Sequence, residues 1–494
     1  MGIIKKQGLQ ATFYSTIGVL IGFLVNAILM PLVLTTEQVG LLSFLGSLSS
    51  IFSGLFALGL SLVILNVYPK YSQKGINGLY TLVLLATFLG IALAIVTYLV
   101  GQDSFLKEEN EASEYTYFSI GFIIICAFRV LFRNNDSLIR MTKNTVLGTV
   151  LESLVVKVII LVALTYYYIS SDKSFDLLFF LYVLALSFPG VISQLYLWLK
   201  GIRIGNVRQA IIDFKPFKSH VLSLAAYGVL NAFGVQIVME VDRVMVSNSL
   251  GLESTAIYSI AFLFGAFVKL PAMGIRRISS VLISNAWNEG DIKTIADIYQ
   301  KSCINLGTVG FYLLLGVWLN IDAVFSFLPE EYAAGKYVML LIGLGHVVDM
   351  AFGVNNEILA TSKFFRYTTY FMAALIIVVI TLNALLIPIY GINGAALASL
   401  IALASVNIFR FIFLLNKYRF QPFNWKMVLL LLISAVFFFL PLVLPEVDNK
   451  VLSILMTSAL LTSGYWSIIY AFKISPDIND LIDKNVIRIL RDDN

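Results

Sequence analysis

Charged residues stand near the centres of long apolar runs in this chain. The six deepest are Arg129, Lys157, Asp242, Arg243, Lys269 and Asp349. A charge at the middle of a bilayer costs roughly 2.5–3.5 kcal/mol on insertion scales, so six of them cost on the order of 15–20 kcal/mol. Such charges are tolerated only where they pair with one another or face water, and they usually mark the path of a polar substrate.

The signs of these charges indicate what they could bind. Four of the six are cations, so pairing among them leaves positive charge at depth. Guanidinium and ammonium groups in a hydrated cavity suit an anion, particularly one that carries phosphate. We therefore expect Arg129, Lys157, Arg243 and Lys269 to line a substrate cavity. Arg133 and Arg276, which share helix faces with Arg129 and Lys269, extend this predicted binding set.

The carboxylates in these runs could serve transport rather than catalysis. The chain lacks a GxxxxGK[ST] phosphate loop, an HExxH motif and a GxSxG elbow, so we expect neither ATP hydrolysis nor another enzyme activity. The two cysteines form no CxxC pair and the two histidines are far apart, so we expect no metal site. The only expected cofactor is a coupling H⁺ or Na⁺, for which Asp242, Asp349 and Glu357 are the candidates.

A structural interpretation of the same charges stays open. In it, Asp136 pairs with Arg133, Glu240 pairs with Arg243, and Asp349 pairs with a cation elsewhere. The shallower Arg276, Arg277 and Arg410 could instead extend their stems to the membrane interface.

Composition determines the class of protein. Of 494 residues, 59% are hydrophobic and 13% are charged, and the mean hydropathy is +0.88. Soluble domains average about 25% charged residues, so this is an all-α polytopic membrane protein. The positive-inside rule, by which cytoplasmic loops carry extra Lys and Arg, explains the net charge of +5, so we expect no nucleic-acid partner.

Stretches of about 20 apolar residues predict fourteen transmembrane helices. They span 11–34, 39–66, 79–100, 117–139, 146–170, 176–200, 220–249, 256–286, 303–320, 336–360, 368–388, 392–415, 426–444 and 450–472. One alternating set of loops and termini holds 22 Lys and Arg residues and the other holds 4. By the positive-inside rule both termini are cytoplasmic, and the acidic segment 103–114 is external.

The chain resembles itself at an offset near 216–220. Residues 26–40 align with 242–256, and 135–143 align with 355–363. The repeat predicts an N-lobe at 1–219 with helices 1–6 and a linker, a C-lobe at 220–420 with helices 7–12, and helices 13 and 14 at 421–472. Lobes of six helices have the same orientation, so an axis along the membrane normal should relate them around a central cavity. Amphipathic patterns predict interfacial helices at 288–301 and in a cytoplasmic tail at 473–494, the latter capped by Ser475.

Several short motifs occur in a characteristic order: TEQVG at 36–40, ALGL at 57–60, Asp242-Arg243, AIYSIA at 256–261 and YGINGAA at 390–396. With the fourteen-helix plan, they make the chain resemble the polysaccharide flippases, including O-antigen flippases, of the multidrug/oligosaccharidyl-lipid/polysaccharide exporter superfamily. The GING motif at 391–394 has no counterpart before the predicted sixth helix, where SDK stands at 171–173.

This resemblance implies a function. Such proteins move polyprenyl-pyrophosphate-linked oligosaccharide units of polysaccharide and lipopolysaccharide biosynthesis across the bacterial inner membrane by alternating access. Implied partners are this lipid-linked substrate, membrane lipids, and a polysaccharide polymerase with its assembly proteins. The alternatives are a flippase for lipid-linked peptidoglycan precursors, a cation-coupled multidrug exporter of the same superfamily, and a non-transporting membrane scaffold or an acyl- or glycosyltransferase.

Overall fold

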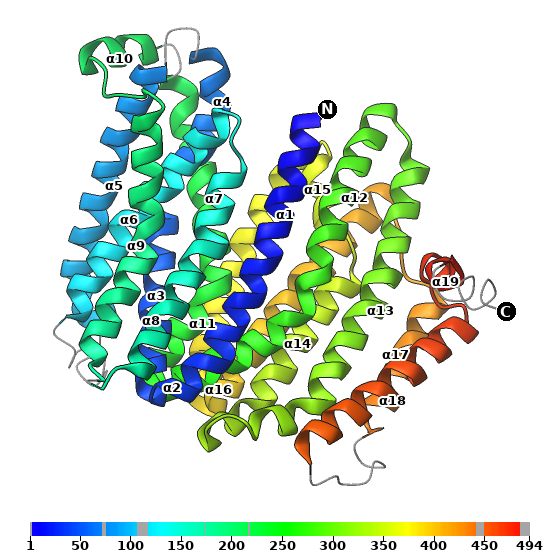
Figure 1. Ribbon diagram of the computed structural model, residues 1–494. Coiled ribbons are helices and arrows are strands. Elements are labelled where there is room, and N and C mark those ends of the chain that lie inside the picture. Colours follow the sequence, from blue (N-terminus) through cyan, green and yellow to red (C-terminus); the bar gives the residue numbers. More distant parts are fainter. Residues whose placement is uncertain are drawn as a thin grey trace. The chain divides into compact units, whose positions relative to one another are not determined.

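A computed structural model of the chain describes residues 2–71, 76–105, 117–171, 173–215, 218–440 and 449–484 (Figure 1). Within these ranges every regular element is a helix. Eleven helical segments are long and apolar enough to cross a membrane. The predicted all-α polytopic membrane fold is confirmed.

Two very long helices explain why eleven segments accommodate fourteen predicted spans. Helix α11 (Lys218–Ala266) contains the non-helical residue Gly251, and α16 (Arg366–Tyr418) contains the non-helical residue Gly391. Each glycine has a positive φ, of 86° and 59°, and lies between two predicted spans. A shorter apolar helix, α17 (Trp425–Phe438), lies on the thirteenth predicted span. As far as the structure describes them, the predicted spans fall mainly on helix, but a turn at Ala57–Gly59 divides the span 39–66 and a turn at Phe352–Val354 divides the span 336–360.

The chain forms two compact units, Met1–Ser259 and Ile260–Asn494. The first holds α1 (Gly2–Phe23), η1 (Leu24–Leu29), α2 (Met30–Val33), α3 (Thr36–Phe56), α4 (Leu60–Tyr71), α5 (Ile76–Phe105), α6 (Phe118–Met141), α7 (Val146–Val150), η4 (Leu151–Val155), α8 (Val156–Ile169), α9 (Phe175–Leu199), α10 (Val207–Phe214) and most of α11. The second holds η6 (Phe267–Lys269), α12 (Leu270–Glu289), α13 (Ile292–Phe325), η7 (Glu330–Gly335), α14 (Lys336–Ala351), α15 (Asn355–Thr361), α16, α17, α18 (Lys450–Ala471) and α19 (Pro476–Ile482). The repeat-based boundary at 219 stays a prediction.

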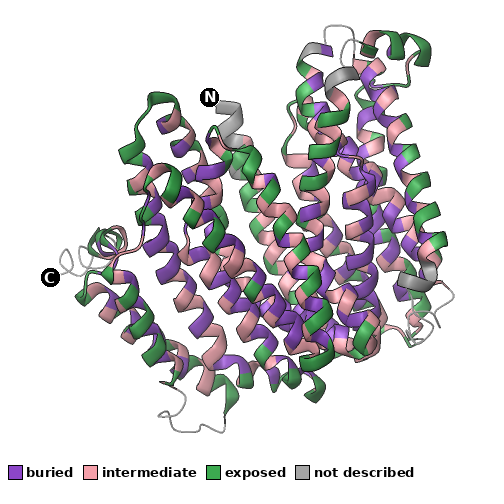
Figure 2. Cartoon of the chain, turned by 180° about the vertical axis from the view of Figure 1, so that it is seen from behind, coloured by how far each residue is buried: buried purple, intermediate pink, exposed green. Residues whose placement is uncertain are grey.

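Each unit has its own apolar core, and apolar side chains also cover its outside. In the first unit, α6 packs against α9 and α3, and in the second, α14 packs against α16 and α13. Exposed and buried residues alternate along the helices (Figure 2). Helix α5 exposes Phe88, Leu93 and Val100, a surface that suits lipid rather than water.

Local sequence determines where several helices begin. The Thr35 hydroxyl accepts a hydrogen bond from the Gln38 N–H, and the Gln38 side chain accepts one from the Thr35 N–H, which forms a capping box at the start of α3. Asp291 caps α13: its carboxylate accepts hydrogen bonds from the Thr294 hydroxyl at 2.6 Å and from the Thr294 N–H at 3.0 Å. These two hydrogen bonds hold the pKa of the Asp291 carboxyl below its ordinary value.

The prediction of a separate interfacial helix at 288–301 is wrong. Helix α13 runs without a break from Ile292 to Phe325 and includes both that segment and the ninth predicted span. The physical reason is that neither glycine nor proline occurs between Asp291 and Gly307, so nothing in that stretch stops the helix.

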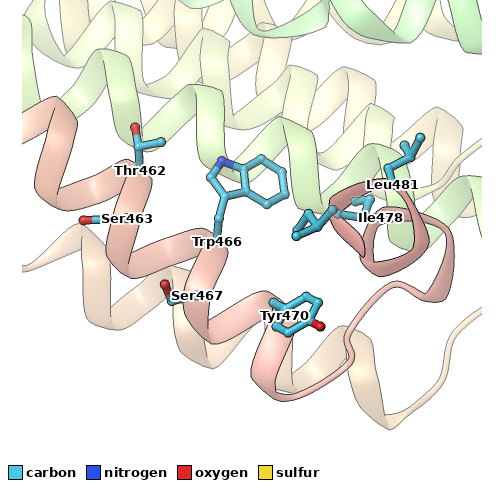
Figure 3. A pocket seen from close by; sticks show the side chains of 8 residues that line it. Thr462, Ser463, Trp466, Ser467, Tyr470, Ile478 and Leu481 are labelled. Carbon is cyan, nitrogen blue, oxygen red and sulfur yellow. The ribbon is translucent and has the colours of Figure 1, made fainter. Parts of the chain in front are cut away.

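The predicted cap of the C-terminal tail is confirmed. The Ser475 hydroxyl accepts a hydrogen bond from the Ile478 N–H at 3.2 Å, and α19 follows. Trp466 and Tyr470 of α18 line a pocket of about 550 Å³ together with Ile478 and Leu481 of α19 (Figure 3). The segment 103–114 lies mostly, and the rest of the tail at 485–494 entirely, outside the described residues.

Candidate functional site

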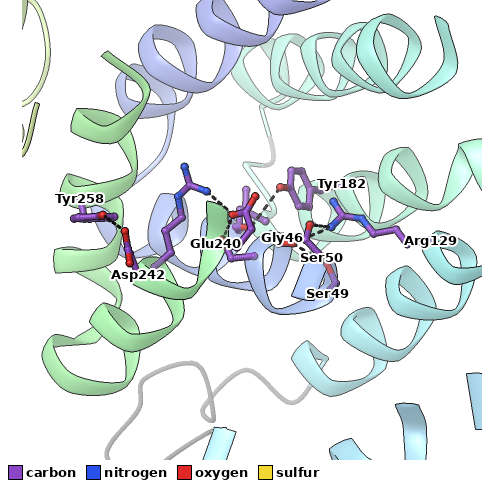
Figure 4. Close-up of polar contacts among 11 residues, drawn as sticks. Gly46, Ser49, Ser50, Arg129, Tyr182, Glu240, Asp242 and Tyr258 are labelled. Carbon is purple, nitrogen blue, oxygen red and sulfur yellow. Dashed lines mark hydrogen bonds and ion pairs between the residues drawn. The ribbon is translucent and has the colours of Figure 1, made fainter. Parts of the chain in front are cut away.

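A polar cluster in the first unit is built on one face of α3. Ser47, Ser50 and Ser53 recur every three residues and so lie along one side of that helix. Arg129 of α6 donates hydrogen bonds to the Gly46 carbonyl, at 2.9 Å, and to the Ser50 hydroxyl (Figure 4). One turn further along α6, the Arg133 Nε donates to the Ser53 hydroxyl at 3.1 Å.

Helix α11 contributes a carboxylate and a cation to the same cluster. The Glu240 carboxylate accepts a hydrogen bond from the Ser47 hydroxyl at 2.9 Å and also pairs with Arg243 on its own helix. Asp242 lies apart from this pair: it is buried, and the Tyr258 hydroxyl donates to it at 2.8 Å (Figure 4). The structure thus brings Arg243 to the cluster and places Asp242 in a separate contact, between the two segments of α11 on either side of Gly251.

Lys157 of α8 completes the cluster. It is half-buried, its stem packs against Gly22 of α1, and it lies within electrostatic range of Arg129, Arg243 and Glu240. Four predicted binding residues, Arg129, Arg133, Lys157 and Arg243, therefore lie in one part of the first unit. The carboxylates Glu152 and Glu240 balance only part of their charge, so the cluster is cationic.

A second polar network lies in the second unit. One Asp349 oxygen pairs with Arg276 at 2.8 Å, and the other accepts a hydrogen bond from the Asn407 amide at 3.0 Å. The Asn407 oxygen in turn accepts from the Asn355 amide at 2.9 Å. Helices α12, α14, α15 and α16 meet at this network, and Asp349 is its centre.

Three further charged residues surround the network. Glu357 and Arg410 are within electrostatic range of Asp349 and Arg276, and one Glu357 oxygen is buried without a hydrogen-bond partner among the described residues. Lys269, on the short η6 turn, is half-buried and within electrostatic range of His346. The structure therefore gathers the predicted residues Arg276, Lys269, Asp349 and Glu357 in one unit, with Arg276 committed to Asp349.

The structure decides between the alternative roles of several charges. The pairs Glu240–Arg243 and Asp349 with a cation are confirmed. The pair of Asp136 with Arg133 is wrong: Asp136 pairs with Arg140 at 2.6 Å, because Arg140 lies one helical turn away and Ser53 holds Arg133. Arg410 does not extend to the interface either, since only 7% of it is exposed.

Sequence reasoning missed the neutral members of both sites. The α3 serines and Asn407 bind the charged groups, and Asn355 binds Asn407, but uncharged polar residues in apolar runs do not by themselves indicate a site. For the serines, the spacing of Ser47, Ser50 and Ser53 along one helix face was the available signal. Among the described residues no group of three His, Cys, Asp or Glu side chains could hold a metal, and Cys126 and Cys303 are buried free thiols.

Comparison with known proteins identifies the family. The family described as "Polysaccharide biosynthesis protein" matches residues 8–283, which is more than half of the chain, and the MatE family matches residues 229–385. No curated protein matches the sequence at a significant level.

Solved structures share the fold at low sequence identity. The "Lipid II flippase MurJ, inward closed conformation" is 14% identical with a TM-score of 0.73, over 94% of this chain and 100% of that one. An inward-facing multidrug resistance MATE family transporter of the MOP superfamily is 10% identical with a TM-score of 0.64, over 81% and 94%. A mutant of the Vibrio cholerae MATE transporter VcmN is 16% identical with a TM-score of 0.55, over 84% and 98%. These folds are those of flippases and transporters rather than of catalysts. The chain belongs to the polysaccharide biosynthesis protein family.

Proposed function

We propose that this protein moves polyprenyl-pyrophosphate-linked oligosaccharides, such as O-antigen units, from the cytoplasmic to the outer leaflet of the bacterial inner membrane. The observation that carries the proposal is the cationic cluster of Arg129, Lys157 and Arg243 inside a transporter-like fold of the polysaccharide biosynthesis family. Such cations at membrane depth suit a diphosphate, which a neutral or cationic substrate would not require.

The chemistry proposed for the cluster is reversible binding. Arg129 is held in position by α3, so its charge is available to a ligand without reorganisation of a long side chain. The diphosphate would bind there while the polyprenyl tail stays in lipid. Alternating access would then carry the head group across the membrane, and both chain termini would lie in the cytoplasm.

We propose that the second unit supplies the coupling. Asp349 and Glu357 lie beside Arg276 and Arg410, so a proton or sodium ion that reached a carboxylate would weaken its attraction to those cations. Asp242, bonded to Tyr258, is the third coupling candidate. Membrane lipids, a polysaccharide polymerase and its assembly proteins are the partners proposed to accompany transport.

A second candidate is transport of a lipid-linked peptidoglycan precursor. The observation that favours it is the TM-score of 0.73 with a protein described as a lipid II flippase. A multidrug exporter is disfavoured because a cationic drug would be repelled by the cationic cluster of the first unit.

Deletion of the gene tests the proposal. We expect lipid-linked oligosaccharide to accumulate on the cytoplasmic leaflet, as measured by extraction and by its protection from an external glycan-modifying enzyme in intact spheroplasts. Plasmid-borne wild-type protein should reverse the accumulation. Accumulation of peptidoglycan precursor would support the second candidate instead, and loss of drug resistance without either lipid would contradict both.

A further inference from the structure

A cavity in the first unit adjoins the cationic cluster and shares Arg133 and Glu152 with it. It has a volume of about 540 Å³ and lies between the α3–α4 break, α6, η4 and α11. Small-molecule sites usually measure about 300–1,000 Å³, so the cavity is large enough for a ligand. Its polar lining includes Arg133, Asp136, Arg140, Glu152 and Asn231, and Phe132 supplies an apolar wall.

The charges of this cavity are balanced. Arg140 pairs with Asp136 at 2.6 Å, and the exposed Glu152 lies within electrostatic range of Arg133. Arg133 uses Nε to bind Ser53, which leaves its two terminal nitrogens without a hydrogen-bond partner in the described chain. Two cations and two carboxylates thus present donors and acceptors without net charge.

The walls of the cavity depart from regular α-helix at two places. Leu58 and Gly59 both have positive φ, of 54° and 62°, and they separate α3 from α4. Leucine rarely adopts this conformation, and such strain tends to occur at binding sites. Glu152 stands on the π-helical turn η4, a kind of distortion that also occurs frequently at functional sites. Two independent distortions therefore shape this cavity.

We propose that the cavity binds the saccharide part of the substrate, an inference that rests on the proposed function. A phosphate would meet Asp136 and Glu152 and be repelled, whereas a sugar hydroxyl both donates and accepts hydrogen bonds. Carboxylates and guanidinium groups on one surface therefore match a row of hydroxyls. The diphosphate is left to the cationic cluster, where Arg129, Lys157 and Arg243 lie.

Thiol protection tests this assignment on the purified full-length protein. Asn231→Cys places a thiol at the cavity, the two native cysteines are buried, and Ser326→Cys is an exposed control in the second unit. The probes are the glycan released by mild acid from the lipid-linked glycans of the source cells, and inorganic pyrophosphate. At about ten times its dissociation constant the glycan should slow modification by a charged thiosulfonate about tenfold at position 231, since about one site in eleven is then empty. It should not slow modification at position 326.

Three outcomes decide the matter. Protection by the glycan and not by pyrophosphate supports the saccharide site, and Glu152→Gln should then weaken that protection. Protection by pyrophosphate alone would make the cavity a phosphate site and overturn the assignment. Equal modification with every probe would also overturn it. Failure of the proposed function appears separately, as unchanged lipid-linked oligosaccharide in the deletion strain.

Discussion

At the scale of single residues, Arg129 in the first unit and Arg276 in the second are held in different ways. In the first, Arg129 is bound by a carbonyl and a hydroxyl of α3, which are neutral, so its positive charge is not cancelled. In the second, Arg276 is bound by the Asp349 carboxylate, which cancels its charge. The first arrangement leaves the charge of Arg129 uncancelled, and the second joins two helices through an ion pair.

Charge reversal at Arg129 tests the first role. We expect Arg129→Glu to abolish complementation of the deletion strain, because a carboxylate there would repel both Glu240 and an anionic substrate, while the protein still reaches the membrane. Growth and polysaccharide export would be measured together with membrane abundance by immunoblot. Lys336→Gln, which removes a peripheral ion pair with Asp322, is the matched control and should export normally. Full activity of Arg129→Glu would contradict the proposed role.

Removal of one partner tests the second role. Asp349→Asn should leave Arg276 without its paired carboxylate and lower stability by on the order of 3 kcal/mol. Arg276→Gln in the same protein should recover part of that loss, because the unpaired charge is then gone. Thermal unfolding in detergent measures both. A double variant no more stable than Asp349→Asn would show that an unpaired Arg276 charge is not the cause of the loss.

At the scale of elements, glycine breaks determine how helices meet. Gly251 interrupts α11, and directly after it the Leu252 carbonyl approaches Gly40 of α3. A Cβ at Gly40 would stand 1.9 Å from that carbonyl oxygen, so only glycine allows this approach. The contact joins α3, which carries the serines of the cationic cluster, to α11, which carries Glu240 and Arg243.

Alanine substitution measures this contact. We expect Gly40→Ala to destabilise the protein by about 1–3 kcal/mol, the usual cost of overpacking. Gly274→Ala is the control: no atom lies within 4 Å of its added Cβ, so the change should be neutral or slightly stabilising. Melting temperatures in detergent compare the two variants. A stable Gly40→Ala protein would mean that α3 and α11 can separate at little cost.

At the scale of the whole molecule, the distribution of Lys and Arg predicts the orientation. The loops and termini predicted to be cytoplasmic hold 22 of these residues, against 4 on the other side. The helices of the structure agree with most of the predicted spans on which this orientation depends.

Reporter fusions test this orientation. A fluorescent reporter that matures only in the cytoplasm should be active when fused after Asn494. Alkaline phosphatase, active only outside the cytoplasm, should be active when fused after Leu328, between α13 and η7. The reversed pattern would contradict the predicted topology.

The sequence by itself determined the helical segments, the charges within them and the start of several helices. These features depend on local hydropathy and on capping residues a few positions apart, as with Thr35 and Gln38. It placed the end of one helix wrongly at 301, where no glycine or proline stops α13.

Only the tertiary structure decided which charge meets which partner. Arg129 reaches Ser50 across 79 positions, Ser47 reaches Glu240 across 193, and Asp349 reaches Arg276 across 73. Helical periodicity predicts which residues share a face, but not which faces meet. The packing of the helices determines these partners. Asp136 pairs with Arg140, and Arg410 is buried. Neutral serines and asparagines bind the charged groups, which would be costly without partners in a membrane.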